Sequence, residues 1–275
     1  MTDTSLPPVG RTAIGVAGLR AQEQLRPDKL FDDPFSAALF EAGRAQLPGA
    51  PTGAQGERQA FGQLFATQVA VRTRFYDDYL LGSGCTQVVL LAAGLDARAF
   101  RLTWPGGTRL FEVDFPEVLG FKGNVLSGQG ARPRCERVEV PADLREDWTS
   151  ALTDAGFDPA APTAWLAEGL LIYLTYDEAA ALLTTVTELS APGSRISFEH
   201  RPGPDGTGLT ALARAHHAGK HVTEMWKGGL GTDGPEWLSA RGWTATGRDR
   251  EELAAAYGRP VDEASGVGFL TATRS

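Results

Sequence analysis

One turn of the chain carries the residue types of a nucleotide-binding site. Five apolar residues, 88–92, run into the sequence Ala92-x-Gly94-x-x-Ala97, where dinucleotide-binding proteins have Gly-x-Gly-x-x-Gly or Ala. A strand that ends in such a turn and starts a helix offers a ligand free backbone N–H groups and the positive end of a helix dipole. Gly94 lets the backbone approach the ligand closely, because it has no Cβ atom. The turn therefore predicts a nucleotide site.

Acidic residues stand at or just after the ends of four candidate strands. Asp114 lies 20 residues beyond Gly94, and an acid at this distance accepts hydrogen bonds from both hydroxyls of a ribose. The carboxyl ends of parallel strands meet at one edge of a sheet, which is where α/β proteins bind ligands. Each acid alone also fits a helix N-cap or a solvated loop. Together they predict a row of acceptors along this edge: Asp96, Asp114, Asp143 and Glu168.

Asp96 distinguishes between two classes of ligand. It stands inside the turn, where a pyrophosphate would lie, and a carboxylate repels a phosphate unless the charge is offset. S-adenosylmethionine has no phosphate and carries an ammonium group, for which nearby carboxylates are suitable partners. The residues therefore favour S-adenosylmethionine as the cofactor, with S-adenosylhomocysteine as its product. A dinucleotide-dependent oxidoreductase with a degenerate glycine motif is the alternative from another enzyme class.

The chain from residue 86 onward predicts the sheet that positions these residues. Short apolar runs rich in β-branched residues alternate with helical patterns, which is typical of a parallel sheet covered on both faces. A capping box, Thr175 to Glu178, predicts the start of a helix. We expect an α/β fold with a doubly wound, mostly parallel sheet. Its strands are expected at Gln87–Ala92, Thr108–Val113, Arg137–Val140, Thr163–Ala167, Ser194–Glu199 and Val267–Thr273, with Trp243–Thr246 as a weaker seventh candidate.

Residues 1–85 are predicted to form a helical region that covers the site as a lid, because apolar and small residues recur at helical spacing from Ile14 to Leu25. Residues 86–275 form the Rossmann-like core. A Pro/Gly-rich break after the fifth strand predicts a substrate-loop insertion around 201–235. Four phenylalanines of the lid either contact an aromatic acceptor or pack in the core: Phe31, Phe35, Phe61 and Phe65. The substrate loop is expected to include His216, Trp226, Gly228, Gly229 and Gly231.

Composition and charge exclude several classes of partner. The 275 residues carry a net charge of −8 with a pI near 5.1, whereas nucleic acids and anionic membranes require a basic surface. There is no signal-peptide pattern and no run near the roughly 18 apolar residues of a membrane span, so we expect a cytoplasmic protein. Cys85 and Cys135 have no ligand-like spacing. His217 and His221 are four apart but lack a third ligand, so no metal site is predicted.

Five motifs, taken in order, resemble the leucine carboxyl methyltransferase family. They are RTRFYDD at 72–78, LAAGLDARAFRL at 91–102, FEVDFPEV at 111–118, the Asp143-Leu144 pair and AEGLLIYL at 167–174. The similarity runs from Thr12 to about His200, and the chain looks most like the bacterial branch that includes polyketide O-methyltransferases of antibiotic biosynthesis. The resemblance implies a class I methyltransferase fold with seven strands and with S-adenosylmethionine bound at the strand edge.

The resemblance also implies a role for each matching residue. Arg72 would pair with the carboxylate of the methionine part, which suits a planar guanidinium, and Arg74 is a competing candidate. A surface ion pair with Asp77 or Asp78 is the structural alternative for either arginine. The remaining implied contacts are Gly94 with the methionine part, Asp114 with the ribose, Asp143 and Leu144 with the adenine, and Glu168 with the methionine amino group.

One departure from the family lies in the turn itself. The family has Gly-x-Gly where this chain has Ala92-Ala93-Gly94. The methyl group of Ala92 narrows the room around the cofactor, unless the backbone accommodates it by keeping φ negative. A homologue that binds the cofactor without catalysing a reaction therefore stays open as an alternative.

The leading hypothesis is O-methyl transfer to a carboxylate of a small molecule, such as a polyketide acid. A carboxylate is ionised at neutral pH and needs no general base. A hydroxyl acceptor would need one, and His200, directly after the fifth strand, is the candidate. Tyr173 either contacts the acceptor, by the resemblance, or packs as a core tyrosine. Sequence does not separate a free acid from a peptide C-terminus, and a homodimer is left open.

Overall fold

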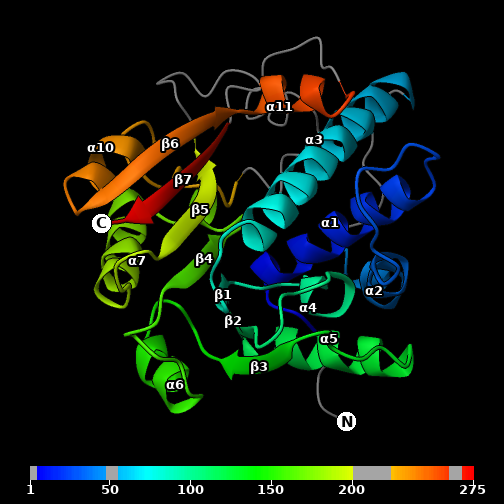
Figure 1. Ribbon diagram of the computed structural model, residues 1–275. Coiled ribbons are helices and arrows are strands. Elements are labelled where there is room, and N and C mark those ends of the chain that lie inside the picture. Colours follow the sequence, from blue (N-terminus) through cyan, green and yellow to red (C-terminus); the bar gives the residue numbers. More distant parts are fainter. Residues whose placement is uncertain (1–4, 48–54, 201–223, 260–267) are drawn as a thin grey trace.

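A sheet of seven strands lies at the centre of the protein (Figure 1). The computed structural model describes residues 5–47, 55–200, 224–259 and 268–275, and only the backbone of residues 55–61 and Leu64. The strand order is β3-β2-β1-β4-β5-β7-β6; β1 to β5 are parallel, and β7 is antiparallel to both its neighbours. The bounds are Gln87–Leu91 (β1), Arg109–Asp114 (β2), Glu136–Pro141 (β3), Thr163–Ala167 (β4), Arg195–His200 (β5), Trp243–Asp249 (β6) and Gly268–Arg274 (β7).

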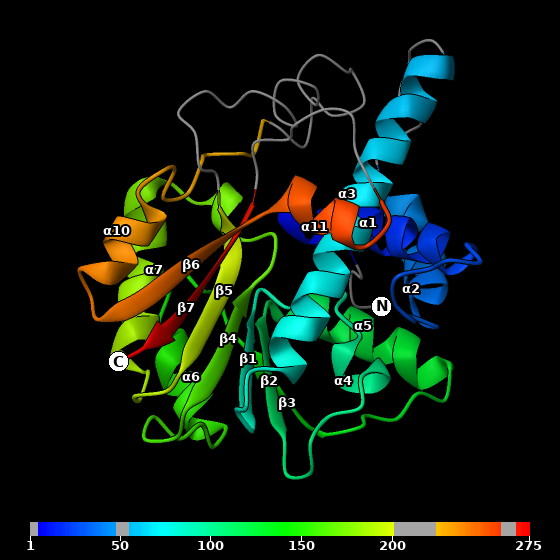
Figure 2. The same cartoon turned by 45° about the horizontal axis from the view of Figure 1, so that its top comes forward.

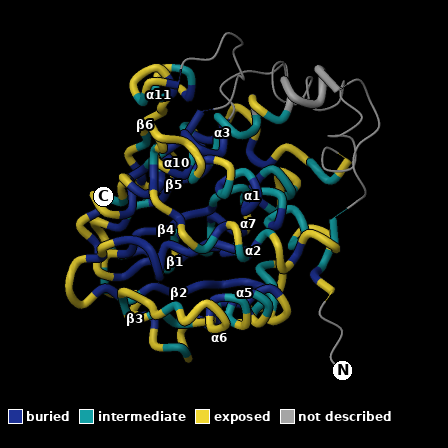
Figure 3. The backbone as a smooth tube through the Cα atoms, turned by 90° about the vertical axis from the view of Figure 1, so that its right-hand side faces the viewer, coloured by how far each residue is buried: buried dark blue, intermediate teal, exposed yellow. Residues whose placement is uncertain are grey.

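Alternate residues of the strands contribute to two hydrophobic cores, one on each face of the sheet. In β1, Val88 and Leu90 belong to one core and Val89 and Leu91 to the other, since successive side chains of a strand point to opposite faces. All residues of β1 and β4 are buried, as is typical of a parallel sheet covered on both faces. Figure 3 shows these strands in dark blue, within a more exposed outer layer.

Helices cover both faces (Figures 1 and 2). The core that contains Val88 also receives residues of α1 (Pro8–Gln24), α2 (Ser36–Gly43), α3 (Gln55–Leu81), α4 (Arg98–Arg101), α5 (Pro116–Gly128) and α11 (Arg250–Ala256). The other core receives residues of α6 (Trp148–Asp154), α7 (Tyr176–Glu188), α10 (Gly234–Ser239) and the 3₁₀ turn η2 (Leu171–Tyr173). A second 3₁₀ turn, η1 (Arg44–Gln46), follows α2. Helices α1 and α3 pack against each other, so the N-terminal helical region shares its core with the sheet.

The fold predicted from the sequence is confirmed. All seven expected strands form, including the weaker candidate at Trp243, and their ends shift by at most three residues. The capping box is also present, because Thr175 accepts a hydrogen bond from the N–H of Glu178 at 3.2 Å and the Glu178 carboxylate accepts one from the N–H of Thr175 at 2.7 Å. None of the helices in the described ranges is long and apolar enough to cross a membrane. His216, His217 and His221 lie outside the described residues.

Candidate active site

A cavity of 520 Å³ lies at the carboxyl edge of the sheet. Its walls are the loops that follow β1, β2, β3 and β4, together with one face of α1 and Arg72 of α3. The sequence-predicted residues that line it are Arg72, Gly94, Asp96, Asp114, Asp143, Leu144, Glu168 and Tyr173. The row of acids expected at this edge is therefore assembled as predicted.

The turn after β1 is tied to the end of β2. The N–H of Gly94 donates to Asp114 Oδ2 at 2.6 Å, and the N–H of Phe115 donates to Asp114 Oδ1 at 2.7 Å. Gly94 has a φ of +53°, and a Cβ atom added to it would lie 3.3 Å from the Cβ of Ala13 in α1. Burial raises the pKa of Asp114, and the two N–H groups offset part of this effect. The carboxylate of Asp114 is thus fixed in place at the cavity wall.

Ala92 has a left-handed backbone conformation. Its φ is +52°, in the left-handed region that favours glycine, and it lines the cavity. The prediction that Ala92 could be accommodated by a negative φ is therefore wrong. An L-residue in this region costs about 1–2 kcal/mol, because its Cβ atom approaches the following carbonyl oxygen.

Three arginines surround Glu168, which follows β4. Arg20 lies 2.7 Å from Oε1, Arg72 Nε lies 2.9 Å from the same atom, and Arg98 lies 2.6 Å from Oε2. Burial alone would raise the pKa of Glu168, but Arg98, Arg20 and Arg72 outweigh it and hold this pKa well below its usual range. Glu168 is therefore ionised at neutral pH and is a weak base.

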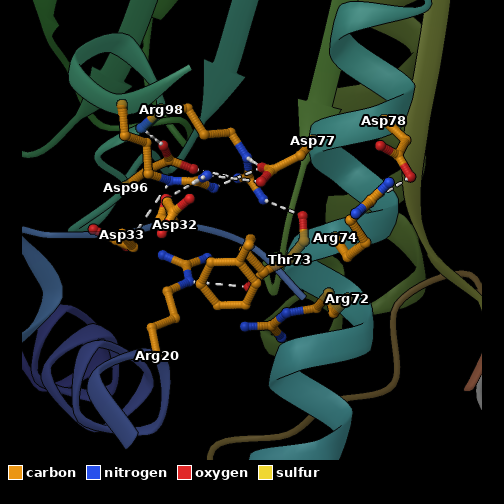
Figure 4. Close-up of polar contacts among 12 residues, drawn as sticks. Arg20, Asp32, Asp33, Arg72, Thr73, Arg74, Asp77, Asp78, Asp96 and Arg98 are labelled. Carbon is orange, nitrogen blue, oxygen red and sulfur yellow. Dashed lines mark hydrogen bonds and ion pairs between the residues drawn. The ribbon is translucent and has the colours of Figure 1, made fainter. Parts of the chain in front are cut away.

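Arg98 is fully buried and connects several carboxylates (Figure 4). Its guanidinium pairs with Asp96 and with Asp77, in the latter case at 2.6 Å, and its backbone N–H donates to Asp96 Oδ1 at 2.6 Å. Asp96 was expected to be an acceptor for an ammonium group. It lines the cavity, but Arg98 already occupies its carboxylate, and Arg98 and Arg20 lower its pKa against the opposing effect of burial. Asp96 thus helps to hold Arg98 in place.

The structure separates the two candidate arginines of α3. Arg72 lines the cavity, whereas Arg74 points away from it and pairs with Asp78 at 2.8 Å (Figure 4). Arg74 also lies over the ring of Tyr257, on the outer face of the helix. The structural alternative, a surface ion pair, holds for Arg74, and the assignment of Arg74 as a cofactor ligand is corrected.

The loop after β3 provides the far wall of the cavity. Asp143 accepts hydrogen bonds from Arg145 Nε at 2.9 Å and Nη2 at 2.5 Å, and these bonds are the main reason why its pKa lies below the usual range. Arg145 extends over the ring of Phe115. Leu144 is partly buried against the hydrophobic core. Leu144 and Phe115 give this end of the cavity apolar surface, next to the polar edge of Asp143.

The two predicted catalytic residues line different cavities. Tyr173 lines the large one, and His200 lines a smaller cavity of 120 Å³ that shares Arg72 and Gly169 with the first. Burial lowers the pKa of His200, so its imidazole is neutral at pH 7. The predicted substrate-loop residues Trp226, Gly228 and Gly231 also line the smaller cavity.

The three phenylalanines of the predicted lid whose side chains are described do not line either cavity. Phe31 is buried under the guanidinium of Arg101, and Phe35 packs edge-on against Phe100, so both have a packing role. Phe65 likewise lies outside both cavities, and the side chain of Phe61 is not described. Within the described residues no group of three or more His, Cys, Asp or Glu residues is placed to hold a metal ion.

Two arginines of the site were missed in the sequence. Arg20 shares a face of α1 with Ala13 and Val16, and all three line the cavity. The spacing of these three residues indicates one face of a helix. The apolar and small residues counted from Ile14 to Leu25 lie on a different face, so Arg20 was not identified. Arg98 stands two residues beyond Asp96, and only the fold shows that it also reaches Asp77 and Glu168.

The cavity fits the chemistry of S-adenosylmethionine. The strand order β3-β2-β1-β4 places Leu144, Asp114, Gly94 and Glu168 in sequence along one edge. That order corresponds to an apolar purine surface, a carboxylate for two hydroxyls, a close backbone approach and a charged end for a zwitterion. The charged end contains Arg20 and Arg72 as partners for a carboxylate.

Comparison with solved structures defines the fold as that of the class I methyltransferases. A structure from Thermobifida fusca, named as a methyltransferase, matches with a TM-score of 0.56 at 18% identity, over 90% of this chain and 92% of the other. Human N-acetylserotonin methyltransferase in complex with S-adenosylmethionine matches with a TM-score of 0.50 at 15% identity, over 88% and 65% of the two chains.

The chain belongs to the leucine carboxyl methyltransferase family, whose sequence model matches residues 13–187. A Parafrankia protein is 48% identical over 97% of this chain and 87% of its own length, and a Frankia alni protein is 49% identical over 97% and 94%. Both are named as S-adenosyl-L-methionine-dependent methyltransferases. The chain is an S-adenosylmethionine-dependent methyltransferase, as the resemblance of its motifs implied.

Proposed function

We propose that this enzyme transfers a methyl group to a carboxylate oxygen of a small-molecule acid, such as a polyketide acid. Support comes from the chemistry of the large cavity and from the family resemblance of its motifs. An acid is the acceptor class that needs no general base, since a carboxylate with a pKa near 4 is already ionised at neutral pH.

In this proposal the sheet edge holds the cofactor. Asp114, fixed by the N–H groups of Gly94 and Phe115, accepts hydrogen bonds from the ribose hydroxyls. The loop that contains Asp143 and Leu144 contacts the adenine.

The charged end of the cavity takes the methionine part. Arg72, together with Arg20, binds its carboxylate, and Glu168 receives its amino group. This part of the cofactor carries one positive and one negative group. It therefore adds no net charge to a network in which arginines and carboxylates already alternate.

The observation that carries the choice of acceptor is the lack of a free base among the described residues that line the large cavity. Four of its five carboxylates have pKa values below the usual range, and a weak base accelerates proton transfer little. For Glu178 the cause is first the N–H of Thr175 and then Lys227, which lies 3.0 Å away. The fifth, Asp114, has a pKa that burial raises, but both of its oxygens already accept hydrogen bonds from backbone N–H groups.

The residues of the chain then act by positioning. The bound cofactor supplies an electrophilic methyl group on a sulfonium. Tyr173 orients the acceptor next to the cofactor, and α1 covers the turn at Gly94 and excludes water. Alignment of two reactants can lower a barrier by about 7–11 kcal/mol in favourable cases.

A hydroxyl acceptor is the second candidate, favoured by one observation. His200 is neutral at pH 7 because burial lowers its pKa, and it lines a cavity that adjoins the large one. A neutral imidazole there would accept a proton at one ring nitrogen from a phenol or alcohol that spans the two cavities.

The test is a turnover screen with methyl-labelled cofactor against paired acids and phenols. A methyl ester is cleaved by mild hydroxide and a methyl ether is not, so the product class is read directly. For the carboxylate, His200→Ala retains turnover within a few-fold, whereas loss of about 100-fold or more would favour the hydroxyl and base catalysis. Arg74→Ala is the control variant, since Arg74 lies outside both cavities.

A further inference from the structure

The smaller cavity is a built polar pocket next to the cofactor cavity. It has a volume of 120 Å³ and shares Arg72 and Gly169 with the large cavity. The other polar and charged side chains on its wall include Glu199, His200 and Arg250. Complete small-molecule sites have about 300–1,000 Å³, so this pocket accommodates one group of a larger molecule.

Arg250, the first residue of α11, is a buried cation without an ion pair to a described residue. Only 5% of it is exposed. Its Nη1 donates to Gln68 Oε1 at 2.9 Å, while its Nε has no hydrogen-bond partner among the residues that the structure describes. Burial lowers the pKa of Arg250 to about 10; Glu199 acts against this effect and Arg72 adds to it. A buried charge that lacks a counter-ion is costly, so the folded protein is suited to receive an anion here.

Helix α3 carries further donors close to Arg250. Gln68, Arg72 and Tyr76 are spaced four residues apart and therefore lie on one face of the helix. Gln68 Nε2, Arg72 Nε and Tyr76 Oη are buried and, like Arg250 Nε, make no hydrogen bond within the described structure. Arg72 Nε is an ion-pair partner of Glu168 at 2.9 Å, without hydrogen-bond alignment. Buried polar groups are normally satisfied, so the three donors that have no such partner, on Gln68, Tyr76 and Arg250, indicate a missing acceptor.

The charges that face the smaller cavity leave a positive excess on Arg250. Glu199 is the carboxylate on its wall, and its oxygens already accept from Arg72 Nη1 at 3.2 Å and from the N–H of Gly169 at 2.8 Å. Arg72 has Glu168 as a second partner. His200 is neutral, because burial lowers its pKa. Two guanidiniums therefore face one carboxylate.

We propose that the smaller cavity is the subsite for an anionic group of the methyl acceptor, and that Arg250 binds there a carboxylate other than the one that is methylated. This inference rests on the proposed function and narrows its substrate class. A guanidinium binds a carboxylate through two parallel hydrogen bonds. The shared wall at Arg72 and Gly169 lets such an acceptor extend from Arg250 into the cofactor cavity. Neutral phenols of the same size are then poor acceptors.

The test uses propionate and its neutral isostere propionamide as probes, titrated by calorimetry into enzyme saturated with S-adenosylhomocysteine. Saturation removes the cofactor site as a competing anion site. The variants are Arg250→Gln and Arg250→Lys. Arg44→Gln is the matched control, because Arg44 is an exposed arginine paired with Glu41. We expect roughly millimolar binding of propionate to the wild type and the control, and little binding of propionamide. Arg250→Gln should weaken propionate binding by at least about tenfold.

Equal propionate affinity in the wild type and Arg250→Gln would overturn the inference, as would equal binding of propionate and propionamide. An unchanged affinity for S-adenosylhomocysteine shows that a variant is folded. If Arg250→Gln does not bind S-adenosylhomocysteine, the test uses Arg250→Lys instead. That variant must then bind propionate more weakly than the wild type does. Propionate binding that depends on Arg250, with no methyl ester formed from any acid, would support the subsite and reject the proposed carboxyl acceptor.

Discussion

Replacement of Ala92 by glycine is predicted to stabilise the protein, because Ala92 has a φ of +52°. An L-residue in the left-handed region costs about 1–2 kcal/mol, which glycine avoids. Against this gain, glycine makes the unfolded chain more flexible, which costs about 0.4–1 kcal/mol. The free energy of unfolding should therefore rise by about 0.5–1 kcal/mol in Ala92→Gly.

The measurement is thermal unfolding of Ala92→Gly beside the wild type, without ligand. A change of 1 kcal/mol shifts Tm by about 2–4 °C in a domain of this size, so we expect an increase of about 1–4 °C. Ala93→Gly is the matched control, because Ala93 is buried and has no positive φ. That variant loses a buried methyl group and gains flexibility, so it should lose about 1–2 kcal/mol. An equal loss of stability in both variants would refute the left-handed assignment of Ala92.

Three further predictions concern the charged end of the cavity. Arg72→Ala should weaken S-adenosylhomocysteine binding by about 10–100-fold, because a hydrogen bond to a charged group contributes about 1.5–3 kcal/mol. Arg74→Ala should change this affinity less than twofold, and equal effects of the two variants in calorimetry would contradict the assignment of Arg72 to the cofactor's carboxylate. Glu168→Gln should lower the free energy of unfolding in urea by about 3–5 kcal/mol, since three arginines lose a carboxylate, and a loss near zero would be against the network. Folding lowers the pKa of Glu168, so this residue contributes to the free energy of unfolding above its unfolded pKa, about 4.3, and the contribution is lost as pH falls toward the folded pKa. Between about pH 5 and 3 the wild type should therefore lose more stability than Glu168→Gln, and parallel curves of stability against pH for the two proteins would exclude this linkage.

The sheet could be predicted from the sequence because its signals are local. A run such as 163–167 is apolar throughout, and such a run fits a strand that is buried on both faces. The spacing of 20 residues between Gly94 and Asp114 predicted their proximity, and in the structure these residues are joined by a hydrogen bond of 2.6 Å. A turn and an acid at the ends of adjacent parallel strands meet for reasons of topology alone.

The partners of the charged residues could not be predicted in the same way. In the sequence Asp96 had no evident partner. In the structure it forms an ion pair with Arg98, the first residue of α4, and the path of the turn into α4 brings the two side chains together. Arg74 and Arg72 have the same residue type two positions apart, and only the packing of α3 decides which one faces the cavity. Arg250 is separated from Gln68 by 182 residues, and no local pattern indicates such a contact.

The turn at Gly94 and the carboxylate of Asp114 are proposed to hold the nucleoside of S-adenosylmethionine. Calorimetric titration with S-adenosylhomocysteine, and in parallel with NAD, tests this proposal on the wild type, Asp114→Ala and the control Asp147→Ala, whose side chain caps α6 away from the cavity. We predict micromolar binding of S-adenosylhomocysteine to the wild type and the control, a loss of about tenfold or more in Asp114→Ala, and no binding of NAD. Equal affinity in Asp114→Ala and the wild type, or comparable binding of NAD, would contradict the account.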